Sequence, residues 1–121
     1  MSKEVEIFEV GPRDGLQNEP AFISSEDKIA LTQALAGAGL RRIECASFVS
    51  PKWVPQMADA AQVVEGVTPG AAQLYALAPN NRGLRAALAT PVGGLCVFIA
   101  ATEGFSRANT NISLAGAGER V

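Results

Sequence analysis

Short apolar runs alternate with longer amphipathic segments along this chain of 121 residues. The apolar runs cover residues 5–10, 40–48, 72–78 and 95–101, and the last of them is almost continuously apolar. Runs of this length with β-branched and aromatic members predict strands, and a continuous apolar run is typical of a buried parallel strand. We therefore expect four strands.

Apolar residues at helical spacing fill the three intervals between these expected strands. The first helix is predicted to begin at residues 24–27 (Ser-Ser-Glu-Asp), where a hydroxyl cap precedes acidic residues, and to end at Gly39. The second begins near residue 55 and stops at residues 68–70, and the third opens at residues 79–83. The apolar positions that define the helices are Ile29, Leu31, Ala34, Leu35 and Ala38 in the first, Met57, Ala60, Ala61, Val63, Val64 and Val67 in the second, and Leu84, Ala87 and Leu88, expected to face inward, in the third.

Strands that alternate with helices of this length predict parallel βαβ units, in either an open doubly wound sheet or a closed barrel. The first strand-to-helix loop has neither of the glycine patterns that cradle phosphates in open sheets. In a TIM (β/α)₈ barrel all strands direct their carboxyl ends at one shared site, and polar residues follow every strand here. Since such a barrel needs about 250 residues, we predict a single partial domain over residues 1–121, the first half of a TIM barrel with about four parallel strands. The polar residues are Arg13 and Asp14, then Ser47, then Pro79 and Asn80, then Thr102 and Glu103, with Glu44 inside the second strand.

Composition excludes several classes of protein. Hydrophobic residues make up 48% and charged residues 18%, so the chain can bury a core, and its net charge of -2 predicts no nucleic-acid partner. No run is long enough to span a bilayer, and the acidic N-terminus lacks the apolar region of a signal peptide, so no membrane partner is expected. Cys45 and Cys96 lie in apolar runs, which predicts buried free thiols and a cytoplasmic location.

The first loop, residues 10–20 (VGPRDGLQNEP), contains the most varied set of polar side chains in the chain. Gly11 and Gly15 free its backbone, and Arg13 is suited to a planar grip on a carboxylate, phosphate or enolate oxygen. Asp14 beside it is a hard oxygen ligand for a cation, or a base. A surface turn with a local Arg–Asp pair explains the same residues, and residue types alone leave both interpretations open.

Two long motifs together carry a resemblance to a known family. Residues 10–19 (VGPRDGLQNE) are followed at the second strand by residues 43–57 (IECASFVSPKWVPQM). This combination closely resembles the 3-hydroxy-3-methylglutaryl-CoA lyases, which belong to the metal-dependent aldolase- and Claisen-type barrel enzymes. Further matches are residues 78–80 (APN), Phe105 and residues 109–111 (NTN), so the resemblance covers nearly the whole chain.

The resemblance implies a retro-Claisen cleavage of 3-hydroxy-3-methylglutaryl-CoA to acetyl-CoA and acetoacetate, with a bound Mg²⁺ or Mn²⁺. Asp14 matches the family's aspartate metal ligand, and Arg13 matches the arginine that steadies the thioester oxygen as it becomes enolate-like. Glu44 matches an acidic residue needed at the site, and direct participation, a bond to a loop or a pair with Arg13 all stay open. The chemistry agrees, because the reaction needs a base for the hydroxyl proton and positive charge where the enolate forms.

Several other residues keep two interpretations. Gln17 is expected to bind substrate or to hydrogen-bond the first loop, and the loop is the preferred partner. Ser47 and Asn109 are expected to line the substrate pocket or to cap the following helix. Arg82 and Arg85 either meet CoA phosphates or belong to a solvated helix face.

The chain also departs from the family's pattern. The family's His-x-His metal ligands, a later Asn ligand and its mobile cysteine have no counterpart, and the sequence contains no His. We therefore expect an incomplete N-terminal portion, inactive alone, whose open strand edges pair with a missing C-terminal half or in a homo-oligomer. The alternatives are a non-catalytic fragment or interaction module, or a lyase for a related 3-hydroxyacyl-CoA.

Overall fold

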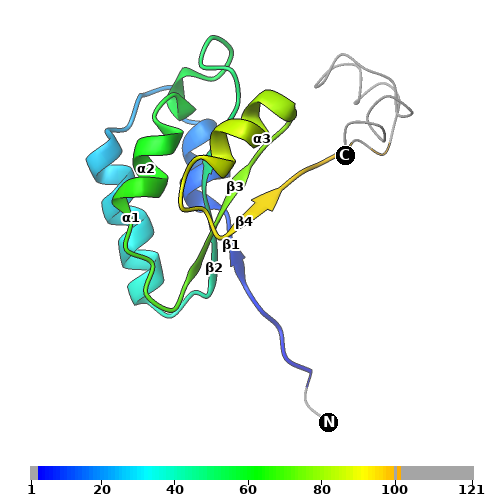
Figure 1. Cartoon of the computed structure of the whole chain (residues 1–121). Helices are drawn as coiled ribbons and strands as arrows, with labels where there is room; N and C mark the ends of the chain where they lie inside the picture. Colours follow the sequence, from blue (N-terminus) through cyan, green and yellow to red (C-terminus); the bar gives the residue numbers. More distant parts are fainter. Residues whose placement is uncertain (1–2, 100, 102–121) are drawn as a thin grey trace.

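A computed structural model describes residues 3–99 and residue 101, which form a parallel sheet of four strands with three α-helices (Figure 1). The strand order is β1-β2-β3-β4, so each strand pairs with the next along the sequence. Right-handed crossovers that always step in one direction place the helices on the same face of the sheet. This is the arrangement of the first half of a TIM (β/α)₈ barrel, as predicted. The strands are β1 (Phe8–Glu9), β2 (Arg42–Ser47), β3 (Gln73–Leu77) and β4 (Gly94–Cys96), and the helices are α1 (Ser25–Gly37), α2 (Ala60–Gly66) and α3 (Asn81–Leu88).

The core lies between the sheet and these helices. Because side chains alternate along a strand, every second residue of β2 and β3 points to the helical layer. The register pairs Ile43 with Leu74, and both are buried. The buried cluster joins strand residues with small and β-branched residues of α2 and α3: Ile43, Cys45, Ala46, Phe48, Ala60, Val63, Val64, Val67, Leu74, Ala76 and Ala87.

The helix ends follow their expected chemistry. The Ser24 hydroxyl accepts a hydrogen bond of 3.1 Å from the Asp27 backbone N–H, which confirms the predicted start of α1. Gly39 takes a φ of 97° just beyond α1, a conformation that favours glycine. Asn80 caps α3 by accepting a bond of 2.8 Å from the Gly83 N–H. Among the described residues, no helix is long and apolar enough to cross a membrane.

The buried faces of two helices differ from the apolar pattern. In α1 the fully buried positions are Lys28 and Thr32, while Leu31 is exposed. Lys28 is buried because its ammonium group is paired, as described below. In α3 the prediction that Leu88 faces inward is wrong, since it is 64% exposed. Ala87, which was also predicted to face inward, is fully buried, because a small residue lets the helix pack closely on the sheet.

Three element boundaries also differ from the sequence pattern. The first strand shrinks from residues 5–10 to β1, because only its two residues pair with β2. The second helix splits into a 3₁₀ turn at Pro55–Met57 and α2, with Asp59 at the break. The fourth strand is β4 alone, and residues 97–99 beyond it are exposed rather than buried. The expected loop at residues 102–111, with Asn109, lies outside the described residues.

Candidate active site

The first loop is not an irregular turn but a π-helical turn over Gly11–Gly15. The N–H of Asp14 donates to the Val10 carbonyl at 2.7 Å, and the N–H of Leu16 reaches back to the Gly11 carbonyl. Turns of this wide type are rare and occur frequently at functional sites. The turn follows β1 directly and contacts β2, so it sets Arg13 and Asp14 over the carboxyl end of the sheet. Sequence reasoning missed this geometry, since glycine and proline predict only a loop.

Arg13 is held between two carboxylates. Its Nε donates to Glu44 Oε1 in an ion pair, and its Nη1 lies 3.5 Å from Asp14 Oδ1. Glu44 alternates with Ile43 and Cys45 along β2, so its side chain points away from the helical layer, and it is only 4% exposed. Because the two carboxylates lie against Nε and Nη1, Nη2 remains available to an anionic oxygen in the described structure. The sequence left three roles open for Glu44: direct participation, a bond to a loop, or a pair with Arg13. The structure shows the pair with Arg13.

These groups open into a cavity of about 860 Å³ at the carboxyl ends of the strands. All four strands or the loops after them contribute to its wall, as a barrel site requires. The Asp14 side chain is 57% exposed and lines this cavity, so one carboxylate can reach a ligand there. The lining residues are Arg13, Asp14, Gln17, Asn18, Glu44, Val49, Ser50, Trp53, Val54, Leu77, Pro79, Asn80, Cys96, Val97 and Phe98.

Gln17 lines the same cavity, and its buried Oε1 atom has no hydrogen-bond partner among the described residues. The hydrogen bond within the first loop comes instead from Asn18, whose Nδ2 donates to the Asp14 carbonyl at 2.8 Å. A buried amide oxygen without a partner is costly unless a ligand or water completes it. The geometry therefore favours the ligand-facing interpretation of Gln17 over the preferred loop interpretation.

Cys96 is a site residue that sequence reasoning assigned to the core. It pairs with Leu77 in the sheet register and lines the cavity near Glu44. Burial, and next a hydrogen bond with Glu44, raise the pKa of the Cys96 thiol to about 12, so it is a neutral group at pH 7. Cys45 faces the helical layer, where burial raises its pKa to about 12. Both cysteines are free thiols, as predicted, but only Cys45 is buried, and Cys96 is partly exposed.

A buried ion pair fastens α1 to the loop after β2, which forms part of the cavity wall. Lys28 of α1 is 2% exposed, and its Nζ contacts the Gln56 carbonyl and Asp59 Oδ1, the latter at 2.6 Å. Ser25 donates to the other Asp59 oxygen at 2.6 Å. Gln56 in turn donates from Nε2 to the Glu19 carbonyl at 2.9 Å. The loop after β2 is thereby fastened to the loop after β1, a link that no sequence motif signals.

Ser47 lies elsewhere. It is fully buried at the end of β2, and a register irregularity between Glu44 and Ala46 changes the simple alternation of side chains before it. It lines a second, smaller cavity and not the one beside Arg13. It caps no helix, because Asp59 holds the N-cap position of α2.

The residues beside Arg13 suit one part of a cation site. Asp14 and Gln17 offer oxygen atoms, the ligand type that Mg²⁺ and Mn²⁺ prefer. Within residues 3–99 and 101, no group of three or more His, Cys, Asp or Glu residues could hold a metal ion. The described donor set therefore fits a hard divalent cation without enclosing it.

Comparisons with known proteins agree with this geometry. A protein of Pseudomonas aeruginosa, described as a 3-hydroxy-3-isohexenylglutaryl-CoA/hydroxymethylglutaryl-CoA lyase, is 51% identical over 121 residues, covering 99% of this chain and 40% of its own length. A hydroxymethylglutaryl-CoA lyase of Bacillus subtilis is 49% identical over 112 residues, which are 92% of this chain and 38% of that protein. The chain thus spans about 40% of the length of these relatives.

Solved structures give the same result. The crystal structure of hydroxymethylglutaryl-CoA lyase from Pseudomonas aeruginosa matches with a TM-score of 0.92 at 51% identity, over 98% of this chain and 40% of that one. An HMG-CoA lyase from Acinetobacter baumannii, in complex with coenzyme A and 3-methylmalate, matches with a TM-score of 0.90 at 34% identity, over 95% and 38%. The family model described as HMGL-like matches residues 4–121. The chain therefore belongs to the HMGL-like family.

Proposed function

We propose that this chain carries the enolate-stabilising half of a hydroxymethylglutaryl-CoA lyase site, and that it takes part in retro-Claisen cleavage once the barrel is complete. The observation that carries the proposal is the position of Arg13, pinned by buried Glu44 at the mouth of the cavity with Asp14 beside it. A guanidinium held in this way needs no reorganisation when negative charge develops on a thioester oxygen.

The reaction places defined demands on these groups. A base removes the proton of the tertiary hydroxyl, the bond between C2 and C3 breaks, and its electron pair passes into the thioester as an enolate. Protonation of that enolate gives acetyl-CoA, and the hydroxyl carbon becomes the ketone of acetoacetate. Arg13 donates hydrogen bonds to the enolate oxygen, while Glu44 keeps the guanidinium oriented from below.

Asp14 is the residue of this chain that would hold a divalent cation, Mg²⁺ or Mn²⁺, with Gln17 as a neighbouring oxygen donor. When bound, the cation would acidify the substrate hydroxyl and orient it. Asp14 has a second effect, because its carboxylate lies beside the Arg13 guanidinium and helps to fix it. The remaining ligands come from outside the described residues, in the rest of the barrel or in another subunit.

The proposed substrate class is the CoA thioester of a 3-hydroxy-3-alkylglutarate. The Pseudomonas aeruginosa relative is described with both a methyl and an isohexenyl substituent, and the Acinetobacter baumannii structure holds coenzyme A. The apolar side of the cavity, formed by Leu77, Val97 and Phe98, suits such a substituent. The neutral Cys96 thiol adds no charge to this side.

A chimeric lyase tests the proposal. In the chimera this chain replaces the aligned 40% of the Pseudomonas aeruginosa enzyme, so that the remainder of that barrel completes the site. We expect cleavage of 3-hydroxy-3-methylglutaryl-CoA in the presence of Mg²⁺, measured as acetoacetate released. A folded chimera that binds the thioester without cleaving it would contradict the proposal, and would favour a non-catalytic role for the chain.

A further inference from the structure

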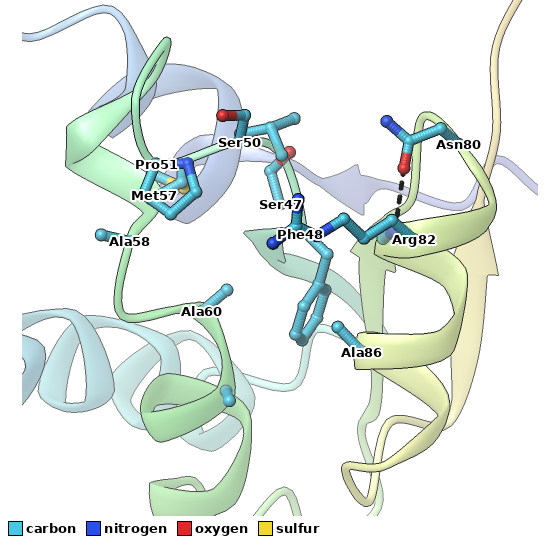
Figure 2. A pocket seen from close by; sticks show the side chains of 13 residues that line it. Ser47, Phe48, Ser50, Pro51, Met57, Ala58, Ala60, Asn80, Arg82 and Ala86 are labelled. Carbon is cyan, nitrogen blue, oxygen red and sulfur yellow. Dashed lines mark hydrogen bonds between the residues drawn. The ribbon is translucent and has the colours of Figure 1, made fainter.

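A second cavity of about 420 Å³ lies between the loop after β2 and the first turns of α2 and α3 (Figure 2). Its volume is within the range of sites that bind small molecules. Its wall is largely apolar, with Phe48, Met57 and Ala60 buried behind it. Figure 2 shows the Arg82 side chain extending from α3 across the cavity toward the Ser47–Phe48 side.

The polar groups of this cavity favour a negatively charged ligand. Among the described residues, Arg82 is the one charged residue that lines the cavity, and it makes no ion pair with any of them. The cavity also reaches the N-terminus of α3, where the helix dipole attracts anions. Lys28 and Asp59 neutralise each other nearby and line neither cavity.

Ser47 supplies an independent sign of a missing partner. Its hydroxyl is completely buried, lines the cavity and makes no hydrogen bond with any described residue. A buried hydroxyl without a partner costs free energy, so it is retained where something else completes it. No cap, turn or neighbouring side chain in the described structure serves Ser47 in this way.

The cavity is built on well-fixed backbone. Phe48 donates its N–H to the Leu77 carbonyl at 2.8 Å, and Asn80 caps α3 through Gly83. Gly83 packs directly against the Phe48 carbonyl, and a Cβ atom there would collide with it. The ends of β2 and α3 are therefore held together by backbone contact, and the cavity between them does not depend on flexible side chains alone.

We propose that this cavity binds a compact organic anion, with a carboxylate or phosphate group and an apolar body of four to six carbons. The anionic group pairs with Arg82 and the N-terminal N–H groups of α3, and the Ser47 hydroxyl donates to it. The apolar body packs on Phe48 and Met57. The cavity adjoins the site beside Arg13, since Val49, Ser50 and Asn80 line both. An anion here would thus be positioned to affect the loop that forms one wall of that site.

Nuclear magnetic resonance titration of the ¹⁵N-labelled chain tests this site without metal or thioester. The probes are hexanoate and n-butyl phosphate, with hexanol as the neutral control. With at least one anion, we expect saturable chemical-shift changes at the amides of Ser47, Phe48 and Gly83. The dissociation constant for that anion should be at least tenfold lower than the one for hexanol. Equal binding of hexanol, no binding of either anion, or shifts centred on Arg13 and Gln17 would overturn the proposal.

Variants locate the anion within the cavity. Arg82→Gln is expected to weaken anion binding at least tenfold, while Arg85→Gln on the same helix, which lines neither cavity, leaves it unchanged. Ala86→Leu at the exposed rim fills the cavity and should abolish binding without a change in thermal stability. Unchanged affinity in folded Arg82→Gln would overturn the assignment. Because no step uses Asp14 or cleavage activity, failure here is distinguishable from failure of the lyase proposal.

Discussion

The two faces of the sheet are built from the same strands and have opposite characters. Toward the helices, Ile43, Cys45, Leu74 and Ala76 are buried against α2 and α3. Toward the other side, the same strands present Glu44 and Cys96, together with the Phe8–Tyr75 edge contact, whose ring centroids are 4.9 Å apart. Figure 1 shows the helices gathered beside the sheet, with β1 and β4 at its open edges.

The difference separates what stabilises this chain from what gives it chemistry. The helical face finds its packing partners within the described residues, so it accounts for most of the hydrophobic stabilisation. The opposite face holds Arg13, Asp14 and Glu44. Their burial and pairing contribute little net stability, but they fix charged groups in place before any ligand binds. Substitutions on the helical face should therefore mainly lower the free energy of unfolding. Substitutions on the opposite face should have smaller effects on stability and should change reactivity.

The largest effect is expected for Lys28→Met on the helical side. The substitution leaves the Asp59 carboxylate buried without its cation, and breaking such a pair costs about 4 kcal/mol in the free energy of unfolding. Urea denaturation followed by circular dichroism measures the loss. The double variant Lys28→Met/Asp59→Leu should recover much of it, and a single variant as stable as the wild-type chain would refute the role given to this pair.

Truncation of the core should be nearly as severe. Ile43→Ala removes three carbons from a fully buried position and is expected to cost about 3 kcal/mol. Val97→Ala, on the exposed segment after β4, is the matched control and should change stability by less than about 0.5 kcal/mol. If both variants lost the same free energy of unfolding, the contrast between the two faces would be wrong.

The substitution Glu44→Gln tests the polar face. It should cause a smaller loss of stability than the core variants and should change the reactivity of the Cys96 thiol. Loss of the charged hydrogen bond to Arg13 should cost about 2 kcal/mol. The pKa of the Cys96 thiol should fall toward its ordinary value, because Glu44 contributes to its rise. Alkylation by iodoacetamide at pH 8.5, located by mass spectrometry, should then be faster at Cys96 and stay slow at Cys45, whose thiol is buried.

The buried Cys45 thiol predicts a specific loss of stability in alkali. Its folded-state pKa of about 12 lies above the value of 9.0 for an unperturbed thiol, so the unfolded chain loses this proton first. The resulting stabilisation is complete below pH 9 and is lost as the pH rises toward 12, at up to about 1.4 kcal/mol per pH unit. In Cys45→Ala, the free energy of unfolding should decline less steeply over that pH range. An identical slope would contradict the assignment of Cys45 as a buried, neutral thiol.

Much of this contrast was predictable from local patterns. The apolar run over residues 40–48 predicted the buried strand, with Glu44 as a polar residue inside it, and the caps at Ser24 and Gly39 have direct chemical signatures. The π-helical turn was not predictable, because it depends on backbone bonds rather than on residue types. The buried Lys28 was missed because its partner Asp59 lies 31 residues away and only the fold brings them together.

Side-chain direction at the site was also beyond the sequence. Ser47 was expected in the pocket because it ends a strand, but it lies beyond a register irregularity in β2 and lines the second cavity. Cys96 belongs to an apolar run, yet its register with Leu77 turns it toward Glu44. For Cys96, the pairing of neighbouring strands decides which face the residue occupies.

The most direct test of the central claim compares two arginines that each pair with a glutamate at opposite ends of the same sheet. Arg13 pairs with Glu44 at the site, and Arg42 lies 3.2 Å from Glu6 at the other end of β2. In the chimeric lyase, Arg13→Gln is predicted to lower kcat for 3-hydroxy-3-methylglutaryl-CoA at least about a hundredfold, while Arg42→Gln leaves kcat within about twofold. Equal loss in both variants, or full activity in Arg13→Gln, would contradict the assignment of Arg13 as the group that stabilises the enolate.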